Sequence, residues 1–460
     1  MTSVVPCPTF RDPAGSLSFE DDRVVRTIRA SGRDSLLEFL ASHLCLRLQQ
    51  RGDLIGTTID DSSGQLRLFH PRIPVITYPW EWTPSQWLQA AELTLTLCDE
   101  ALSEGWILKD ATPLNILFIG SRPIFVDVLS FERRDPASSV WLAYGQYMRT
   151  FLLPLLMNRL LGWPLTLTLF HRDGYEPVEL YTALSWPQRL SRAAFWPITL
   201  ATWLEKRKRP DAPAAQTSSR TKDPELVTHI LRSSFANLRK RTRRAMPKDA
   251  ASNWSEYKNT LTHYTAEQSA QKLAWMKQVL ADLRPERVLD IGANTGEYSA
   301  VAAASAEVVA LERDAASAER LVCMARARNL NIQTIHADLA RPTPPAGWEN
   351  RESTSLLARL EGQSDLVMML AVIHHLLLME QIPLESIIAL CHKLTRRSLV
   401  IEWVPVGDPM YQSLMRKRED LYGYLTDADL LAACEGLFHL VRRRTLGNGR
   451  VLMLFEKVDG

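Results

Sequence analysis

The segment RVLDIGANTG, residues 287–296, constrains the fold of this chain more than any other stretch. It has the pattern of a short apolar strand that runs into a glycine-bearing turn, and the following EYSAVAAASA has helical character. Glycine at position 292 lets the backbone turn sharply and approach a ligand without an intervening side chain. A strand, a glycine turn and a helix in this order predict a βα unit of an open α/β sheet, with a binding site at the carboxyl end of the strand.

The residues that follow continue the alternation of strand and helix. VVALERD predicts a second strand with Glu312 at its end, 20 residues after Gly292, and IQTIHAD predicts a third that ends in Asp338. DLVMMLAVIHHL predicts a fourth strand and SLVIEWVP a fifth. The last two, FHLVRRRTL and RVLMLFEKV, flank the hairpin-type turn LGNG. We therefore expect a doubly wound α/β domain with a seven-stranded, mainly parallel sheet.

This layout resembles that of class I S-adenosylmethionine-dependent methyltransferases, which have a Rossmann-like fold, and the resemblance covers about 205 residues. As a whole the chain is similar to bacterial proteins of that class, nodulation-associated ones included. The resemblance implies S-adenosylmethionine as the cofactor and methyl transfer as the activity. It implies that Asp290 and Gly292 lie near the amino-acid end of the cofactor, Glu312 at the ribose hydroxyls, and Asp338 with Leu339 beside the adenine.

The turn departs from the family pattern at one position. The family's middle glycine is Asn294 here, and asparagine tolerates a left-handed backbone better than most residues. We therefore expect Asn294 and Gly296 to complete a working turn. The spacing G-x-x-x-G does not supply the G-x-G-x-x-G pattern of nicotinamide dehydrogenases, so that class is disfavoured.

The candidates for proton transfer follow the fourth strand. His374 and His375 are expected at the carboxyl edge of the sheet, and a histidine there is suited to act as a general base because its pKa lies near working pH. The alternative is that one of the two packs in the core while the other only lines the pocket.

Two further groups of residues are expected near the same edge. Glu402 and Trp403 end the fifth strand, and a polar cluster that could hold a polar substrate follows them, the alternative being a solvated helix face: Asp408, Arg416, Arg418, Glu419 and Asp420. Before the first strand come aromatic residues that could close over the cofactor or pack in the core: Trp254, Tyr257, His263 and Tyr264.

A second resemblance lies in residues 105–132. Asn115 follows Asp110 by five positions, and Asp127 ends the short apolar run PIFVD. The spacing is similar to the catalytic core of protein-kinase-like phosphotransferases, which implies Asp110 as the base and Asn115 with Asp127 as metal ligands.

Residues 105–132 depart from the protein-kinase pattern at several positions. Leu108 stands two positions before Asp110, where kinases have histidine, and Val128 and Leu129 follow Asp127 in place of Phe-Gly. Residues 1–75 contain neither a glycine-rich loop nor a strand with the phosphate-holding lysine, and without that lysine phosphoryl transfer loses a main source of charge stabilisation. We expect an α+β kinase-like accessory domain rather than an active phosphotransferase.

The chain is too long for one hydrophobic core. We expect an accessory domain over residues 1–204, a basic linker over 205–250 and the methyltransferase domain over 251–460. Residues 206–248 contain 13 Lys and Arg against three acidic residues, a pattern open to RNA, an anionic membrane surface, an acidic partner or simple solvation.

The remaining features set broad limits. The six cysteines show no C-x-x-C pair, so a disulfide framework or zinc site is disfavoured, no metal is expected, and a reducing cytoplasmic location fits. No signal peptide or transmembrane segment is expected. The leading hypothesis is methyl transfer to an unidentified acceptor, a small molecule being favoured over RNA or protein. The alternatives are a non-catalytic, cofactor-binding regulatory protein and a phosphotransferase.

Overall fold

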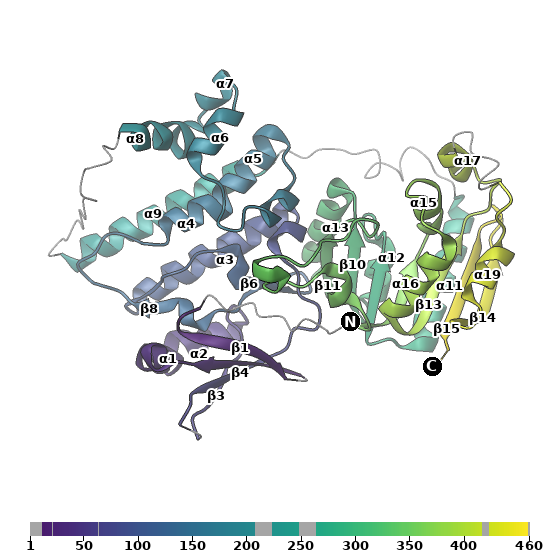
Figure 1. Ribbon diagram of the computed structural model, residues 1–460, viewed down its shortest axis with the longest axis horizontal. Coiled ribbons are helices and arrows are strands. Elements are labelled where there is room, and N and C mark those ends of the chain that lie inside the picture. Colours follow the sequence, from purple (N-terminus) through teal and green to yellow (C-terminus); the bar gives the residue numbers. More distant parts are fainter. Residues whose placement is uncertain are drawn as a thin grey trace.

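The computed structural model describes residues 12–20, 22–62, 64–207, 223–247, 264–415 and 423–458. The described chain is mixed α/β, as expected. Figure 1 shows the first half of the chain beside the second half, which contains the large sheet. One hydrophobic core belongs to the first half, and two others cover the two faces of the large sheet.

The first half begins with a small antiparallel sheet of strand order β1-β2-β4-β3. Its strands are β1 (Gly15–Glu20), β2 (Arg23–Ile28), β3 (Thr58–Asp60) and β4 (Arg67–Pro71). Three helical elements connect β2 to β3: η1 (Ala30–Gly32), α1 (Arg33–Leu40) and α2 (His43–Arg51).

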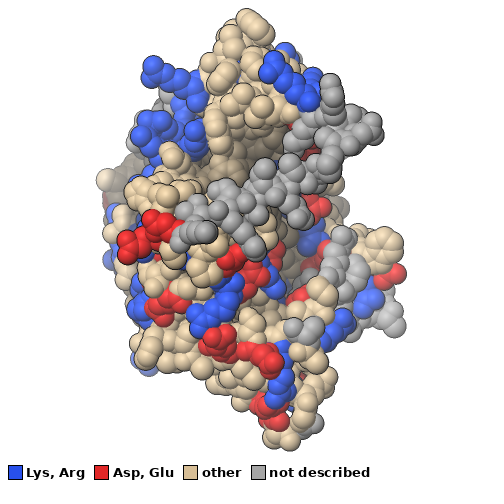
Figure 2. All heavy atoms as spheres, turned by 90° about the vertical axis from the view of Figure 1, so that its left-hand side faces the viewer, with Lys and Arg blue, Asp and Glu red and all other residues tan. Residues whose placement is uncertain are grey.

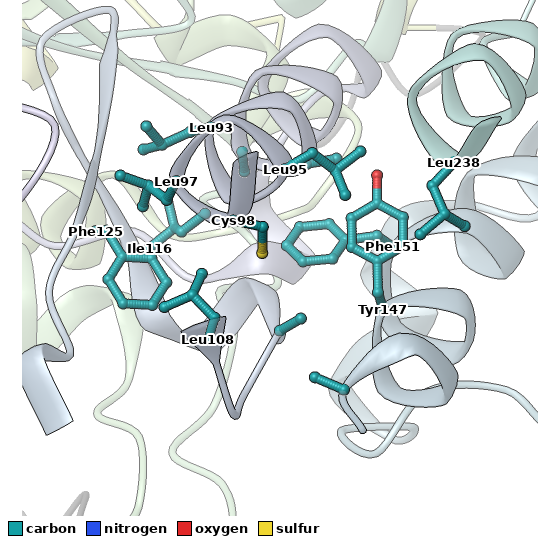
Figure 3. Close-up of a cluster of buried hydrophobic side chains, with 14 of the residues drawn as sticks. Leu93, Leu95, Leu97, Cys98, Leu108, Ile116, Phe125, Tyr147, Phe151 and Leu238 are labelled. Atoms are coloured by element: carbon teal, nitrogen blue, oxygen red, sulfur yellow. The ribbon is translucent and has the colours of Figure 1, made fainter. Parts of the chain in front are cut away.

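Helix α3 (Pro84–Ser103) is the central element of the first core. Its start is fixed by a capping box, in which Thr83 accepts from the Gln86 backbone N–H and Gln86 accepts from that of Thr83, with proline at the first helical position. Figure 3 shows Cys98 of α3 among buried side chains that include Leu108 and Phe151. This helix therefore anchors the short elements that follow it.

Those short elements carry the predicted kinase-like residues. Strands β5 (Trp106–Leu108) and β8 (Phe131–Arg133) pair antiparallel, and β6 (Ile116–Ile119) forms a hairpin with β7 (Arg122–Phe125). Two single-turn helices complete this region, η3 (Pro113–Asn115) and η4 (Val128–Ser130), and a third, η2 (Pro79–Glu81), precedes α3.

A helical layer covers α3. Its elements are α4 (Tyr144–Tyr147), η5 (Met148–Leu152), α5 (Leu153–Leu161), η6 (Leu165–Leu169), α6 (Pro177–Ala183), α7 (Trp186–Arg189), η7 (Phe195–Leu200), α8 (Ala201–Arg207) and α9 (Pro224–Ala245). Helix α9 lies within the residues predicted as a basic linker. Its apolar stripe, which includes Leu231, Phe235 and Leu238, is buried in the first core because the spacing of three and four residues aligns these side chains on one face.

The second half is built on a seven-stranded sheet of order β11-β10-β9-β12-β13-β15-β14. The strands are β9 (Arg287–Ile291), β10 (Glu307–Glu312), β11 (Ile332–His336), β12 (Ser364–Met369), β13 (Thr395–Trp403), β14 (Phe438–Thr445) and β15 (Val451–Lys457). The first five strands in spatial order pair in parallel, and β15 runs antiparallel to both of its neighbours.

Helices cover both faces of this sheet (Figure 1). They are α11 (Ala266–Leu283), α12 (Glu297–Ala302), α13 (Ala315–Ala327), η8 (Trp348–Asn350), α14 (Leu356–Leu360), α15 (Ile373–Leu378), α16 (Leu384–Leu394), α17 (Pro409–Met415) and α19 (Asp427–Cys434). Strand order reverses between β9 and β12, and in open α/β sheets ligands bind at that switch point, beyond the carboxyl ends of the strands.

The two halves are joined along the edge strand β11. Gln333 donates through Nε2 to the Val75 carbonyl oxygen at 2.7 Å, and Gln86 donates through Nε2 to that of Thr334 at 3.1 Å. An open strand edge invites pairing with other chains, so this cover also protects the sheet. Within the described residues no helix is both long and apolar enough to cross a membrane.

Candidate functional site

The glycine turn after β9 has the left-handed backbone that the sequence predicts. Gly292, Asn294 and Gly296 have φ angles of 73°, 50° and 86°. A Cβ added at Gly292 would lie 2.4 Å from Cγ2 of Val372, so the close approach of the segment after β12 also excludes a side chain there. The turn is therefore fixed both by its own backbone conformation and by the neighbouring strand ending.

Asp290, near the end of β9, is buried beneath this turn with 2% of its surface exposed. Its Oδ2 accepts a hydrogen bond from Oγ of Ser299 at 2.6 Å. The pKa of this carboxyl is raised to about 6, mainly by burial and also by the Glu312 carboxylate, against the lowering effects of the Ser299 hydrogen bond and the charge of Lys272. Within the described residues, no cation pairs directly with this acid.

Glu312 ends the adjacent strand β10 and closes the turn. One carboxylate oxygen accepts from the Asn294 backbone N–H at 2.6 Å, and the other accepts from that of Asp314 at 2.7 Å. Burial raises the pKa of Glu312, and these backbone donors oppose the shift. The structure thus brings together Asp290, Asn294 and Glu312, which the sequence predicts as one site.

Asp338 follows β11 at the same edge of the sheet. Its carboxylate accepts from the Ala340 backbone N–H at 2.9 Å and from Nη1 of Arg341 at 3.1 Å. The neighbouring Leu339 lines a small apolar cavity of about 40 Å³ together with Met369. The edge beyond β11 thus combines an acid with an apolar wall.

His374 and His375 lie in α15, directly after the end of β12, with ring centroids 4.2 Å apart. His374 is buried with 2% of its surface exposed, whereas His375 is only partly buried. The pKa of His375 is lowered to about 4, mainly by burial and also by the positive charges of Arg313 and Arg450. Of the two, His375 is the more exposed to solvent.

A buried ionic cluster at the end of β13 was not predicted in full. Glu402 is fully buried and accepts from Nζ of Lys272 at 2.5 Å and from Nη1 of Arg450 at 3.3 Å. Nε of Arg450 also donates to Asp408 at 2.8 Å. Burial outweighs the lowering effect of Arg450, and the pKa of Glu402 is raised to about 7. Asp408 is therefore part of a buried cluster and not of a solvated helix face.

Two tyrosines pack over the cations of this cluster. Tyr264, named in the sequence as a lid candidate, donates through its hydroxyl to Glu402, and its ring lies 4.8 Å from the guanidinium carbon of Arg450. The Tyr298 ring lies 4.5 Å from Nζ of Lys272. Lys272 could have been recognised from the sequence, because it begins a helical stripe that is otherwise apolar, whereas nothing local marks Arg450.

Several predicted residues lie outside the described part of the chain. They are Trp254, Tyr257 and His263 of the expected lid, and Arg416, Arg418, Glu419 and Asp420 of the polar cluster.

The opposite edge of the sheet contains a hollow of about 570 Å³, lined in part by Arg287, Glu307 and Asn331. Arg287 and Glu307 form an ion pair there at 2.7 Å. None of the predicted cofactor-binding or catalytic residues borders this hollow, because parallel strands present their amino ends at this edge.

The three kinase-like residues come together in the first half. Oγ of Ser130 donates to Oδ2 of Asp127 at 2.5 Å, and the same Ser130 oxygen accepts from Nδ2 of Asn115 at 3.1 Å. Burial raises the pKa of Asp110, and the charge of Asp127 adds to the rise. Arg26 of β2 forms an ion pair with Asp127, so the carboxylate expected to hold metal already has a cationic partner.

Comparison of sequences finds one whole-length similarity. The chain is 27% identical to the nodulation protein NoeA of Rhizobium meliloti (strain 1021), in an alignment that covers 98% of this chain and 96% of that protein. No protein-family model matches the chain.

Comparison of structures finds likenesses that cover less than half of the chain. The N-methyltransferase NodS from Bradyrhizobium japonicum WM9 aligns with a TM-score of 0.33 and 13% identity, over 43% of this chain and 100% of that one. The magnesium protoporphyrin IX methyltransferase ChlM from Synechocystis PCC 6803, with bound SAH, aligns with a TM-score of 0.30 and 17% identity, over 42% of this chain and 84% of that one. Both TM-scores are low, so we draw no functional conclusion from these likenesses.

Proposed function

We propose that the second half of the chain binds S-adenosylmethionine and transfers its methyl group to an acceptor, for which a small molecule is favoured over RNA or protein. The observation that carries this proposal is the pair Asp290 and Glu312. The two carboxylates lie at the ends of adjacent parallel strands, on either side of a left-handed turn at the switch point of the sheet.

The charges of the site fit this cofactor. Burial raises the pKa of both Asp290 and Glu312, and the Glu312 carboxylate adds to the rise at Asp290. A ligand with a sulfonium and an ammonium group would relieve the cost of ionising these buried acids. Glu312 would accept from the ribose hydroxyls, because each carboxylate oxygen keeps acceptor capacity beside its one backbone donor. The turn at Gly292, Asn294 and Gly296 would contact the cofactor through its backbone. Asp338 and Leu339 would lie beside the adenine.

When bound, the cofactor supplies a methyl group that is already activated for in-line displacement. The residues of this chain then have to orient the acceptor, exclude water and remove a proton where the acceptor carries one. We propose that a ring nitrogen of His375 accepts this proton, since the imidazole is neutral at working pH. Its pKa is lowered to about 4, which makes it a weaker base than an ordinary histidine and suits it to an acceptor that loses its proton readily. His374 would pack beneath it.

The first half would serve as an accessory domain over residues 1–204, with the methyltransferase domain over 251–460. The Arg26–Asp127 ion pair favours this role over phosphotransfer, because a metal would have to displace the guanidinium. The similarity to NoeA spans both halves, which supports a shared two-part architecture.

Calorimetric titration with S-adenosylmethionine tests the proposal. We expect binding by the native protein that is lost in Gly292→Arg and in Glu312→Ala. Glu307→Ala is the matched control, because Glu307 begins the same strand at the opposite edge of the sheet. No binding by the folded native protein would overturn the proposal. Binding without transfer of labelled methyl groups into a cell extract would favour the regulatory alternative.

A further inference from the structure

A groove of about 360 Å³ lies in the first half, far in sequence from the proposed methyltransferase site. It is bordered by α5, by η7 and by the second half of α9. Its floor is apolar, with Leu152 and Leu156 buried at its base and Phe195 at its side. Its rim is basic, formed by Arg192, Lys240, Arg241 and Arg244.

The basic rim is not neutralised by the protein itself. Arg192, Lys240 and Arg244 are exposed, and among the described residues no carboxylate lies within ion-pair distance of them. On the other side of α9, by contrast, Arg232 pairs with Asp99 at 3.3 Å, and Arg243 forms an ion pair with Glu92. One helix therefore has a neutralised face and a face of free cations, and the free cations are those that line the groove.

Large apolar side chains are exposed beside these cations. Leu190 is 48% exposed, Phe195 38%, Trp203 39% and Leu204 55%. Phe195 and Trp203 are in edge contact, with centroids 6.1 Å apart, so they form a continuous apolar surface across η7 and α8. Figure 2 views the molecule from the left-hand side of Figure 1. In the upper part of this view Lys and Arg lie on both sides of an uncharged, hollowed area, whereas Asp and Glu gather lower down. Grouped exposed hydrophobics of this kind mark interaction sites.

We propose that this surface, the groove with the exposed faces of α7, η7 and α8, docks the protein on an anionic phospholipid membrane. Tryptophan, phenylalanine and leucine insert into the boundary between headgroups and acyl chains, and flanking lysine and arginine bind the headgroup phosphates. The protein would lie on the bilayer and not cross it, since none of the described helices is suited to span one.

The apolar component favours a membrane over RNA. Single-stranded RNA is bound by aromatic rings that stack on bases within a basic groove, and aliphatic side chains contribute little to that stacking. Here Leu190 and Leu204 are at least as exposed as Phe195 and Trp203. Arg241, which lies 4.0 Å above the Trp196 ring, also covers the one further aromatic face in the groove.

Co-sedimentation of the full chain with vesicles tests this proposal. Vesicles of phosphatidylglycerol and phosphatidylcholine in equal parts should bind the protein, and pure phosphatidylcholine vesicles should not. Each basic residue near an anionic surface contributes about fivefold to the partition coefficient, so Lys240→Glu with Arg244→Glu should weaken binding at least about 25-fold. Leu190→Ser with Leu204→Ser should also weaken binding, because it removes the inserted apolar groups.

The control variant changes the net charge by the same amount as the Lys240→Glu with Arg244→Glu variant. Lys277→Glu with Arg328→Glu alters two exposed basic residues of the second half, and this variant should bind vesicles like the native protein. Equal losses in the control and in the groove variant would overturn the proposal, because binding would then depend on net charge alone. Absence of vesicle binding would also overturn it, as would groove-dependent binding of a labelled single-stranded RNA without vesicle binding. Circular dichroism of each variant verifies folding.

Discussion

Lys272 of α11 and Glu402 at the end of β13 form a buried ion pair at 2.5 Å, although they are 130 residues apart in sequence. Both side chains are almost completely removed from solvent. The pair joins the helix that precedes β9 to the end of strand β13. Arg450 and Tyr264 complete the set of donors around Glu402.

Replacing Lys272 with methionine should destabilise the second half. The substitution keeps most of the side-chain volume but leaves Glu402 buried with one cation fewer. Removing one partner of a buried ion pair typically costs about 3 kcal/mol or more, and we expect a loss of that size in the free energy of unfolding measured with urea. The control Lys277→Met, at an exposed position of the same helix, should change it by less than about 0.5 kcal/mol. Equal effects of the two variants would contradict a structural role for the pair.

The stability of the native protein relative to Asp290→Asn should fall as pH rises. The folded-state pKa of Asp290, about 6, lies above the ordinary value of 3.8, so the folded protein holds this proton more tightly than the unfolded chain does. The stabilisation is present at low pH and is lost between about pH 4 and pH 6. A pKa shift of this size corresponds to about 3 kcal/mol in the free energy of unfolding. Urea unfolding of both proteins across this range measures it, and a constant difference would contradict the prediction.

The same ionisation should affect cofactor affinity. Ionised Asp290 attracts a cationic ligand and protonated Asp290 does not, so S-adenosylmethionine should bind more tightly as pH rises through about 6. Calorimetry of the native protein should show this dependence, and Asp290→Asn should show weaker binding without it. An identical pH dependence in the two proteins would assign the effect to another group.

His375→Gln should lower methyl transfer by at least about 100-fold if the imidazole removes a proton from the acceptor. The native rate should not fall near pH 6.5, because the pKa of His375 is lowered to about 4 by burial and by the charges of Arg313 and Arg450. Transfer of labelled methyl groups into a cell extract is the measurement. His374→Gln is the comparison, and it should mainly lower stability because His374 is 2% exposed. Unchanged transfer by His375→Gln would exclude the base role.

Arg359→Met should loosen the contact between the two halves. Arg359 donates to both carboxylate oxygens of the fully buried Glu81 and lies 4.7 Å above the Tyr78 ring. Leaving Glu81 buried without its partner should cost about 3–5 kcal/mol. Hydrogen exchange of the β11 amides should become faster in this variant, whereas Arg326→Met, exposed on α13, should leave exchange unchanged. Unchanged exchange in both variants would mean that the edge of the sheet is held by other contacts.

Magnesium and ATP together should produce no thermal shift in the native protein. Arg26 forms an ion pair with the Asp127 carboxylate, and Asn115 is hydrogen-bonded to Ser130, so the residues predicted to hold metal already have partners. Asp127→Asn should lower the melting temperature, because it leaves the buried Arg26 without its counter-charge. A nucleotide-dependent shift that Asp127→Asn abolishes would instead support phosphotransfer by the first half.

Local pattern was sufficient to predict the cofactor side of the proposed site. The alternation of strand and helix, the turn at Gly292 and Asn294, and the acid at the end of β10 depend on short-range sterics and on side-chain periodicity, which are written in adjacent residues. The terminal hairpin was predictable for the same reason. The amphipathic stripe of α9 was also visible, but the sequence did not indicate that it packs into the first core.

Tertiary structure alone decided the long-range ion pairs. Lys272 with Glu402, Glu81 with Arg359, and Arg26 with Asp127 are 130, 278 and 101 residues apart. A charged residue in isolation is best explained as solvated, and only the packed fold shows that it is buried against an opposite charge. Burial makes such pairs both costly and specific, because a buried charge requires its partner. The sequence by itself therefore determined the elements and the glycine turn, while the fold determined which charges are buried together around them.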